Sequence, residues 1–336
     1  MEADRPTSST RLTAAVLNYN GRELLEALMP TLAVQTCPLR VLVVDNGSTD
    51  DSVAYLRAHW PQATVVALSE NLGVSAGLNR CLQEARGDHV LLLNNDVELD
   101  SRCAEQLLGA LERAGDGPPR VGAVAAQVRF HHAPERVNSA GIEVDRLGIA
   151  SERLAGRPIS AAEEPTEVFG ASACCALYRA EMLAEVGGID DGYIAYLEDV
   201  DLAWRAQAAG WHASYEPAAI AYHRASYSTG AGSRRKYWLV GRSRVRLLAR
   251  NATTGQLLRA APGIFLYDFA YVLYVAIRDR TLAPLQGRLA GMREWRALRR
   301  ARRDSLRLVR LAPARRGWLG ALRQQRAYRQ LSETRD

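Results

Sequence analysis

The segment HVLLLNNDVELD, residues 89–100, decides the fold class. A strand-like apolar run from His89 to Leu93 ends abruptly at two amides and a carboxylate. A short, continuously apolar strand is typical of a sheet that is covered on both faces. Polar residues directly after such a strand are expected at the carboxyl end of a parallel sheet, where α/β proteins bind ligands. The segment therefore predicts a buried strand that delivers polar groups to a binding edge.

The chain around this segment alternates between strand and helix patterns. Strands are predicted at residues 11–20, 40–50, 63–69 and 89–95, and helices at 21–35, 52–59, 73–85 and 104–114. This alternation predicts a doubly wound, mostly parallel α/β sheet with short connections. The 336 residues, 48% of them hydrophobic, suffice for a sizeable core, and the polar residues 1–10 are expected to be flexible. Five scattered cysteines without CxxC spacing predict reduced thiols in a cytosolic protein.

Four successive predicted strands end in Asn or Asp side chains. These candidate ligand-binding residues are Asn18, Asn20, Asp45, Asn71, Asn94, Asn95 and Asp96. Any one of them could serve only a turn, as the composition of residues 45–48 illustrates. Because the carboxyl ends of parallel strands share one edge, the set predicts a binding rim, where Asp45 suits a donor group on a base or ribose.

The phosphate-binding signals are weaker. GxGxxG and GxxxxGK[ST] are both absent from the sequence. Gly73 and Asn79, in ENLGVSAGLNRCL, predict a small-residue helix start that would let a diphosphate approach backbone N–H groups. Asp96 suits a divalent cation such as Mg²⁺ that also binds diphosphate oxygens. The alternative role for Asp96, a helix N-cap, is better served by Asp100 or Ser101.

A second carboxylate cluster follows in residues 170–211. A helix over 179–186 ends at two glycines, and aromatic residues then precede Glu198 and Asp199 at the start of another helix. The helix dipole explains one or two of these acids. The aromatic crowding indicates a sugar-binding cleft that holds a carboxylate base of raised pKa, with Tyr193, Tyr196 and Trp204 as acceptor-binding candidates.

Three further residues of this region have simple predicted roles. Asp201 and Arg205 stand four residues apart on the predicted helix, which favours an intrahelical ion pair. His223 follows a short apolar strand and is either a structural residue or a metal ligand.

Charge divides the chain at residue 234. Residues 234–336 contain 25 basic and 6 acidic residues, whereas residues 1–233 contain 18 basic and 31 acidic residues. Within the basic part, the apolar run 260–277 is interrupted by Pro262 and Asp268, which favours an interfacial or core helix over a membrane span. Arginine interleaved with leucine and with Trp295 and Trp318 suits an anionic membrane surface. A solvated basic helix pair is the alternative, and nucleic acid is disfavoured because no recognised binding module is present.

The motifs LNYNG, VVDNGSTDDS, NLGVSAGLN, LLLNNDVEL and GASACCALYRAEMLAEVGGIDDGYIAYLEDVDLAWR occur in this order and are followed by a histidine. Their combination resembles the family-2 inverting glycosyltransferases of the GT-A fold, in the rhamnosyltransferase-like branch, over roughly residues 11–250. The resemblance implies a catalytic domain at 11–233. Its nucleotide-sugar half would cover about 11–115 and its acceptor half about 116–233, and a helical, arginine-rich, membrane-associating extension would follow at 234–336.

The resemblance also implies roles for individual residues. Asp45 would contact the base, and Asn79 with its loop would contact the nucleotide diphosphate. Asp96, at the last position of a DxD-like motif, would bind Mg²⁺ or Mn²⁺ together with His223. Asp199 would be the general base, and Glu198 would help to bind the acceptor. The first DxD position is Asn94 in this chain, which leaves Asp96 as the main anionic metal ligand.

The function implied by these roles is metal-dependent, inverting sugar transfer. The donor would be TDP-rhamnose or a UDP-sugar, and the acceptor a hydroxyl of a lipid-linked or cell-surface polysaccharide. The enzyme would be cytoplasmic and peripheral on the inner face of the cell membrane. A non-catalytic nucleotide-sugar-binding protein on the same fold is the alternative, against which the presence of Asp96, Glu198, Asp199 and His223 argues. A nucleotidyltransferase is disfavoured because the first 100 residues lack a Gly-rich loop containing Lys or Arg.

Overall fold

A computed structural model describes residues 12–224 and 233–301 of the chain, so the predicted flexible residues 1–10 lie outside the described part. The first half contains the strands β1 (Leu12–Asn18), β2 (Arg40–Asp45), β3 (Thr64–Ala67) and β4 (His89–Asn94). The helices α1 (Arg22–Ala33), α2 (Ser52–His59), α3 (Val74–Glu84) and α4 (Cys103–Ala114) alternate with them. Every strand and helix predicted for this half is confirmed, with ends shifted by a few residues.

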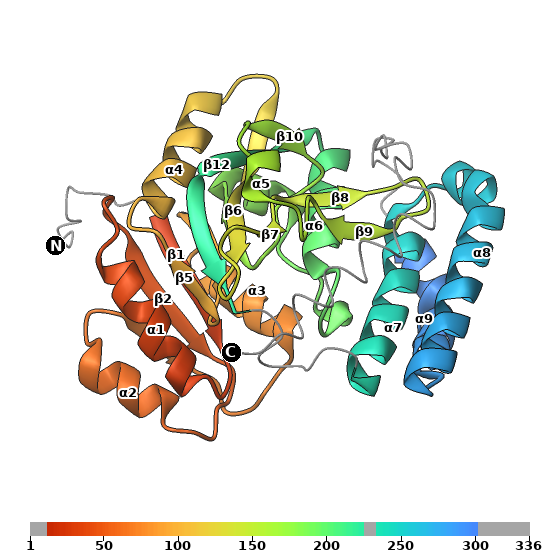
Figure 1. The fold of residues 1–336 in the computed structure, drawn as a ribbon, viewed down its shortest axis with the longest axis horizontal. Helices are drawn as coiled ribbons and strands as arrows, with labels where there is room; N and C mark the ends of the chain where they lie inside the picture. The colour runs from red at the N-terminus through yellow and green to blue at the C-terminus, as the bar shows by residue number, and fades with distance from the viewer. Residues whose placement is uncertain (1–11, 225–232, 302–336) are drawn as a thin grey trace, which may run out of the picture.

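These strands form the parallel part of the central sheet, whose order is β10-β12-β6-β11-β4-β1-β2-β3 (Figure 1). β1 lies between β2 and β4 and pairs with both in parallel register. Asn18 is therefore opposite Asp45, and Leu17 is opposite Asn94. This register brings the polar strand ends together on one rim, as the sequence predicts.

The second half extends the sheet with strands of mixed direction. It contains β6 (Arg120–Phe130), β7 (Val137–Ser139), β10 (Thr166–Val168), β11 (Cys175–Tyr178) and β12 (Trp211–His223). The helices α5 (Ala180–Val186) and α6 (Glu198–Ala208) precede β12. β11 pairs antiparallel with β4 and β6, whereas β12 is parallel to β6. β8 (Ile142–Val144) and β9 (Ala150–Glu152) form a separate hairpin, and the short β5 (Val97–Leu99) pairs with the end of β12.

The core lies on both faces of the sheet. Leu91 and Leu93 of β4 pack in one apolar cluster with α1 and α4, while Leu92 packs in a second cluster with α3 on the opposite face. Burial on both faces explains why β4 is continuously apolar rather than alternating. The described cysteines are unpaired, and four of the five are buried.

Three helices follow the sheet: α7 (Arg234–Asn251), α8 (Thr254–Asp279) and α9 (Ala283–Ala301) (Figure 1). Leu247 and Leu248 of α7 pack in one cluster with Tyr193 and Trp204. The predicted boundary at 233 therefore divides residues that share a core. α8 alone among the described helices is long and apolar enough to cross a membrane by length and composition.

Candidate functional site

The polar rim is held together by side-chain hydrogen bonds between neighbouring strands. Asn18 Nδ2 donates to Asp45 Oδ1 at 2.9 Å, and Asn95 Nδ2 donates to Asn18 Oδ1 at 2.8 Å. A Cβ atom at Gly21 would lie 2.2 Å from Asn95 Nδ2, so only glycine allows this approach. The rim is thus a connected unit built from β1, β2 and the turn after β4.

Asp45 lies inside this unit rather than on its surface. Its side chain is 1% exposed, and it accepts hydrogen bonds from the Ser48 hydroxyl at 2.6 Å and the Ser48 backbone N–H at 2.9 Å. In this conformation the carboxylate is not accessible to the nucleotide base that it was predicted to contact. Asn20 is exposed beside it and accepts the Thr49 N–H at 2.8 Å.

The start of α3 also differs from the prediction. Asn71 Oδ1 accepts the Gly73 N–H at 2.8 Å, which fixes the turn into the helix. The Val74 and Ser75 N–H groups both donate to the Ile194 carbonyl, at 2.8 and 3.1 Å. A backbone carbonyl therefore occupies the helix N-terminus that was expected to receive a diphosphate.

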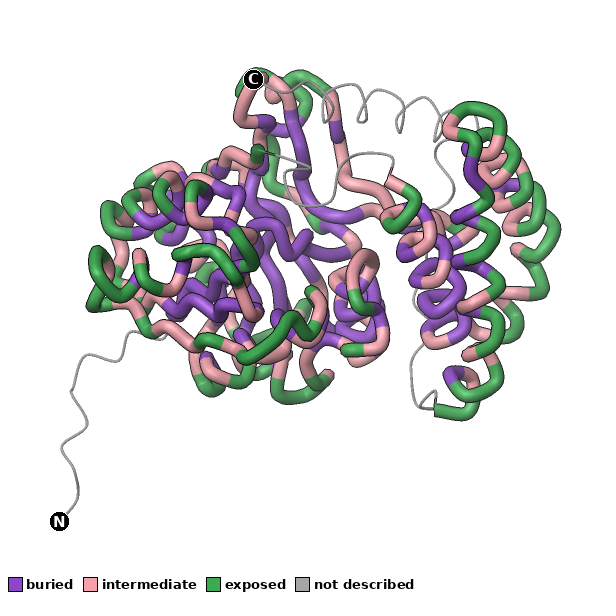
Figure 2. Tube along the Cα trace, turned by 90° about the horizontal axis from the view of Figure 1, so that it is seen from below, coloured by how far each residue is buried: buried purple, intermediate pink, exposed green. Residues whose placement is uncertain are grey.

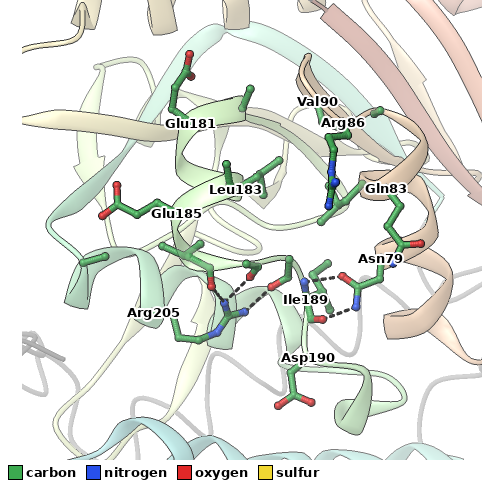
Figure 3. Close-up of a pocket in the computed structure, with 18 of the residues that line it drawn as sticks. Asn79, Gln83, Arg86, Val90, Glu181, Leu183, Glu185, Ile189, Asp190 and Arg205 are labelled. Atoms are coloured by element: carbon green, nitrogen blue, oxygen red, sulfur yellow. Dashed lines mark hydrogen bonds between the residues drawn. The ribbon is translucent and has the colours of Figure 1, made fainter. Parts of the chain in front are cut away.

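Asn79 is directed at Ile189, in the loop before α6 (Figure 3). Its Oδ1 accepts the Ile189 N–H at 2.7 Å, and its Nδ2 donates to the Ile189 carbonyl and to Asp191. It lines a cavity of about 1060 Å³ that also touches Asp88 and Val90 at the amino end of β4. In this conformation the Asn79 amide holds the loop that precedes α6, and its diphosphate contact stays a prediction.

The predicted metal ligands Asp96 and His223 are brought together. β5 pairs antiparallel with β12 so that Val97 is opposite His223, and this register places Asp96 Oδ1 3.2 Å from His223 Nε2. His223 Nδ1 lies 3.1 Å from Asn138 Oδ1, a contact that keeps Nε2 directed toward Asp96. Asp96 does not cap α4, since the Arg102 N–H donates to Asp100 Oδ1.

The two residues adjust each other's protonation. Burial alone would raise the pKa of the Asp96 carboxyl, but the adjacent imidazole and its hydrogen bond outweigh burial and hold that pKa below its usual range. Burial would likewise lower the pKa of His223, but Asp96 raises it well above its usual value. Within the described residues, no third His, Cys, Asp or Glu joins the pair in a ready-made metal cluster. A carboxylate and an imidazole fit a divalent ion whose remaining ligands come from a diphosphate.

The predicted acidic pair stands at the beginning of α6. Asp199 Oδ2 accepts the Ala173 N–H at 3.2 Å, and Oδ1 accepts the Val200 N–H at 2.8 Å. Burial raises the pKa of Asp199. Burial and the charge of Asp199 raise the pKa of Glu198 to about 8. Glu198 Oε2 is buried without a hydrogen-bond partner among the described residues, which leaves it available to a ligand.

Two consecutive residues connect the acidic pair, Glu198 and Asp199, to the pair of predicted metal ligands, Asp96 and His223. The Ala173 N–H donates to Asp199, and Cys174 lies beside His223; burial raises the pKa of the Cys174 thiol to about 11, and the charge of His223 offsets only part of this rise. Both pairs therefore contact the same two-residue segment, whose Cys174 carbonyl accepts the N–H of Asn94 at the carboxyl end of β4.

Sequence reasoning missed Glu152 in this region. It accepts a hydrogen bond from the Ser172 hydroxyl at 3.2 Å and one from Ser139. Burial, together with the charge of Asp199, raises the pKa of Glu152 to about 7. Glu152 and Asn138 come from the β7 to β9 region, where no motif in the sequence pointed to the site.

The aromatic residues have different positions from those predicted. Tyr193 and Trp204 are fully buried in the core, so neither side chain can contact an acceptor in this conformation. Tyr193 instead donates to Asp201 Oδ1 at 3.1 Å. Tyr196 is half-buried and remains the predicted aromatic residue with access to solvent. The predicted pair of Asp201 and Arg205 is confirmed, with Nε and Oδ2 2.8 Å apart.

Comparison with known proteins agrees with this geometry. Residues 13–187 match the model of glycosyl transferase family 2. The chain is 30% identical to an N-acetylglucosaminyl-diphospho-decaprenol L-rhamnosyltransferase of Mycobacterium tuberculosis, over 65% of this chain and 78% of that one. It is 29% identical to the O-antigen biosynthesis protein RfbC of Myxococcus xanthus over 70% of this chain, but over only 19% of that longer protein.

Two solved structures share the fold. GalNAc-T7 with UDP, GalNAc and Mn²⁺ aligns with a TM-score of 0.57 at 13% identity, over 71% of this chain and 47% of that one. The mannosyltransferase PcManGT from Pyrobaculum calidifontis, in complex with GDP-Man and Mn²⁺, aligns with a TM-score of 0.52 at 19% identity, over 87% and 89%. At these identities the likeness concerns the fold alone, and it confirms the GT-A architecture. The chain belongs to glycosyl transferase family 2, in its rhamnosyltransferase-like branch, and is an enzyme of glycosyl transfer.

Proposed function

We propose that this enzyme is a metal-dependent inverting glycosyltransferase. It moves a sugar from a nucleotide-sugar, either TDP-rhamnose or a UDP-sugar, to a hydroxyl of a lipid-linked or cell-surface polysaccharide acceptor. The observation that supports this best is the direct connection, through Ala173 and Cys174, between the base candidate Asp199 and the pair Asp96 and His223. The relatives named for rhamnosyl transfer and O-antigen biosynthesis support the sugar and acceptor classes.

The donor would bind along the rim. Its nucleotide contacts would come from the polar groups that remain reachable there, namely Asn20, Asn71, Gly73, Asn94 and Asn95, while the buried Asn18 and Asp45 hold the rim together. Asp45 contributes by holding the turn in place. Asp96 and His223 would hold Mg²⁺ or Mn²⁺, which when bound supplies positive charge against the leaving diphosphate.

Asp199 would accept the proton of the acceptor hydroxyl. The oxygen then forms a bond to the anomeric carbon as the bond from that carbon to the diphosphate breaks, and the electron pair leaves with the diphosphate. Attack from the face opposite the leaving group inverts the configuration. Burial makes Asp199 a stronger base than an exposed aspartate, and Glu198, with a pKa of about 8, is protonated at neutral pH and donates a hydrogen bond to the acceptor.

The location follows from the acceptor class. An enzyme that modifies a lipid-linked sugar works where the lipid is, so we place it in the cytoplasm at the inner face of the cell membrane. The excess of arginine in residues 234–336 supports attraction to an anionic surface. A role as a non-catalytic binding protein is disfavoured, because Glu198 keeps a buried, unpartnered oxygen beside Asp199.

Replacing Asp199 by Asn tests the proposal. This change removes the proton-accepting carboxylate but keeps the shape of the side chain. The rate of sugar transfer should therefore fall by at least about a thousandfold. Nucleotide binding in the presence of Mn²⁺, measured by calorimetry, should stay within about twofold of the wild type. Glu181→Gln, an exposed change on α5, is the matched control.

Robust transfer by Asp199→Asn would refute the role of Asp199. Binding without transfer by the wild-type protein, across TDP-, UDP- and GDP-sugars, would favour the binding-protein alternative. Nuclear magnetic resonance of the product reports the anomeric configuration, and retention would refute the inverting mechanism.

A further inference from the structure

The exposed apolar side chains of this protein are concentrated on its last helices. Among the described residues, eleven of the sixteen exposed large hydrophobic side chains lie between residues 258 and 292. They are Leu258, Phe265, Leu266, Phe269, Leu273, Tyr274 and Ile277 in α8, and Leu282, Leu285, Leu289 and Met292 in or next to α9. Isolated exposed hydrophobic residues are ordinary, but a contiguous set marks a binding surface.

On α8 these side chains form a single stripe. Leu258, Phe265, Phe269 and Ile277 are spaced by 7, 4 and 8 residues, which places them on one face of a helix. Their exposures are 72%, 74%, 59% and 72%. The stripe is about 30 Å long. Figure 2 shows exposed residues along the outer side of α8, at the edge of the molecule.

The opposite face of α8 is fixed to the protein by partly buried polar contacts. Asp268 accepts hydrogen bonds from Arg244 of α7 at 2.7 Å and from Arg288 of α9 at 2.8 Å. The Tyr237 hydroxyl of α7 donates to Asp279 at 2.6 Å. A transmembrane position for α8 would carry these charged groups into hydrocarbon or separate Asp268 from both guanidinium groups, and either is costly.

The charges around the stripe favour an anionic partner. The exposed arginines of the described residues 254–301 are Arg259, Arg278, Arg280, Arg293, Arg296 and Arg300. The acidic residues of the described segment 233–301 are Asp268, Asp279 and Glu294, and each is engaged inside the helical group. A second copy docked through the same surface would bring arginines against arginines, whereas anionic lipid headgroups complement them.

We propose that α8 is an in-plane membrane anchor, with the Leu258 to Ile277 stripe inserted into the acyl region of one anionic leaflet and α7 held on the aqueous side. Membrane docking is inferred from the exposed apolar stripe and the exposed arginines alone. Its consequence for catalysis rests on the proposed function: α7 also binds the loop before Glu198, through Arg242 to the Gly192 carbonyl at 2.7 Å and Ser243 to the Ala195 carbonyl at 3.2 Å. The anchor thereby fixes the orientation of the acceptor site relative to the membrane.

Flotation of the full-length protein tests the anchor. Vesicles of phosphatidylcholine containing phosphatidylglycerol should bind the wild type, and vesicles of phosphatidylcholine alone should bind it less. The double variant Phe265→Asp with Phe269→Asp should lose binding by at least about tenfold, because it removes two aromatic side chains from the acyl layer. Val34→Asp, at an exposed position after α1, is the matched control and should bind as the wild type does. Unchanged flotation of the double variant would overturn the proposal.

A depth measurement separates an in-plane helix from a span. Nitroxide labels at positions 258, 269 and 277, placed one at a time in a Cys37→Ser background, should report similar depths in one leaflet. A central label much deeper than both end labels would show a span and overturn the proposal. Dimers of the wild type in lipid-free solution that the double variant abolishes would identify a second copy as the partner, which also overturns it.

The anchor and the proposed function fail separately in these assays. Flotation and depth require no sugar, so a protein that docks but transfers nothing would refute only the function. The double variant should also bind nucleotide with Mn²⁺ as the wild type does, which shows by calorimetry that its fold and donor site are intact.

Discussion

Glu198 couples the stability of the protein to pH. Its pKa is about 8 in the folded chain and near 4.5 in an unfolded one, so between these values the folded state binds more protons. The free energy of unfolding that depends on a neutral Glu198 carboxyl is fully present below about pH 4.5. It is lost as pH rises toward 8. Glu198→Gln should therefore stabilise the protein at pH 8.5 by a few kcal/mol and leave it unchanged near pH 4.5. Thermal melts across pH test this, with Glu181→Gln as control; an equal shift at every pH would contradict it.

Asp96 and His223 should determine the metal dependence of donor binding. Removal of the carboxylate in Asp96→Ala leaves one imidazole at the site, so nucleotide affinity in the presence of Mn²⁺ should fall at least about tenfold. Affinity without metal should be unchanged. Calorimetry with and without Mn²⁺ measures both values, and Glu26→Ala, a partly exposed carboxylate on α1, is the control. Unchanged affinity with Mn²⁺ would refute the role of Asp96.

Individual residues show where sequence reasoning works and where it fails. Asp96 after a strand and Asp199 at a helix start were placed correctly, because strand ends and helix starts are visible as patterns along the chain. The bond between Asn79 and Ile189 could not be predicted, because the two residues are 110 positions apart. Tyr193 and Trp204 look alike in sequence whether they line a cleft or fill a core, and the packing of α7 decides that they fill the core. Glu152 had no local signal at all.

At the scale of elements, the loop between Tyr193 and Glu198 holds unusual backbone conformations. Ile194, Tyr196 and Leu197 have φ angles of 67°, 68° and 68°, and Ile194 is β-branched, with ψ at −58°. This loop carries the carbonyl that covers the start of α3. Strained residues of this kind cluster at functional sites, where the surrounding structure enforces them.

Glycine at position 194 should relieve this strain. Ile194→Gly is expected to raise the free energy of unfolding by about 1 kcal/mol, since glycine adopts this conformation without steric cost. Ile194→Ala removes a similar side chain but keeps a Cβ atom, so it should not stabilise the protein. Denaturant unfolding compares the two variants with the wild type. Equal stability of the glycine and alanine variants would show that the loop is not strained at this residue.

The elements themselves were predictable to different degrees. The parallel half of the sheet follows from local periodicity, since each strand and helix there is compact in sequence and buried in a simple pattern. β5, β8 and β9 were not predicted, because each has three residues and forms only through pairing with distant partners. β5 is nevertheless the strand whose register brings Asp96 to His223.

At the scale of the whole molecule, the charge boundary at residue 234 is not a structural boundary. Asp201 of α6 is fully buried and binds Arg250 Nε at 3.2 Å and Asn251 Nδ2 at 2.7 Å, both from α7. Asp190, in the loop before α6, binds Arg250 Nη1 at 2.6 Å. These contacts connect the segment that carries the acidic pair to the first helix of the basic region. Composition detects the change in charge but contains no information about this packing.

A chain ending at residue 233 should therefore fail to fold into a stable catalytic domain. It would expose the core around Tyr193 and Trp204 and leave Asp201 with Arg205 but without its α7 partners. Loss of Leu247 and Leu248 alone removes about 1.5–3 kcal/mol of burial for each side chain, and the orphaned polar groups add to this cost. The matched control ends at residue 301 and keeps α7 with the helices packed on it. Calorimetric melting should show a cooperative transition for the longer chain only, and a cooperative transition of residues 1–233 with intact nucleotide binding would prove that the catalytic unit ends before α7.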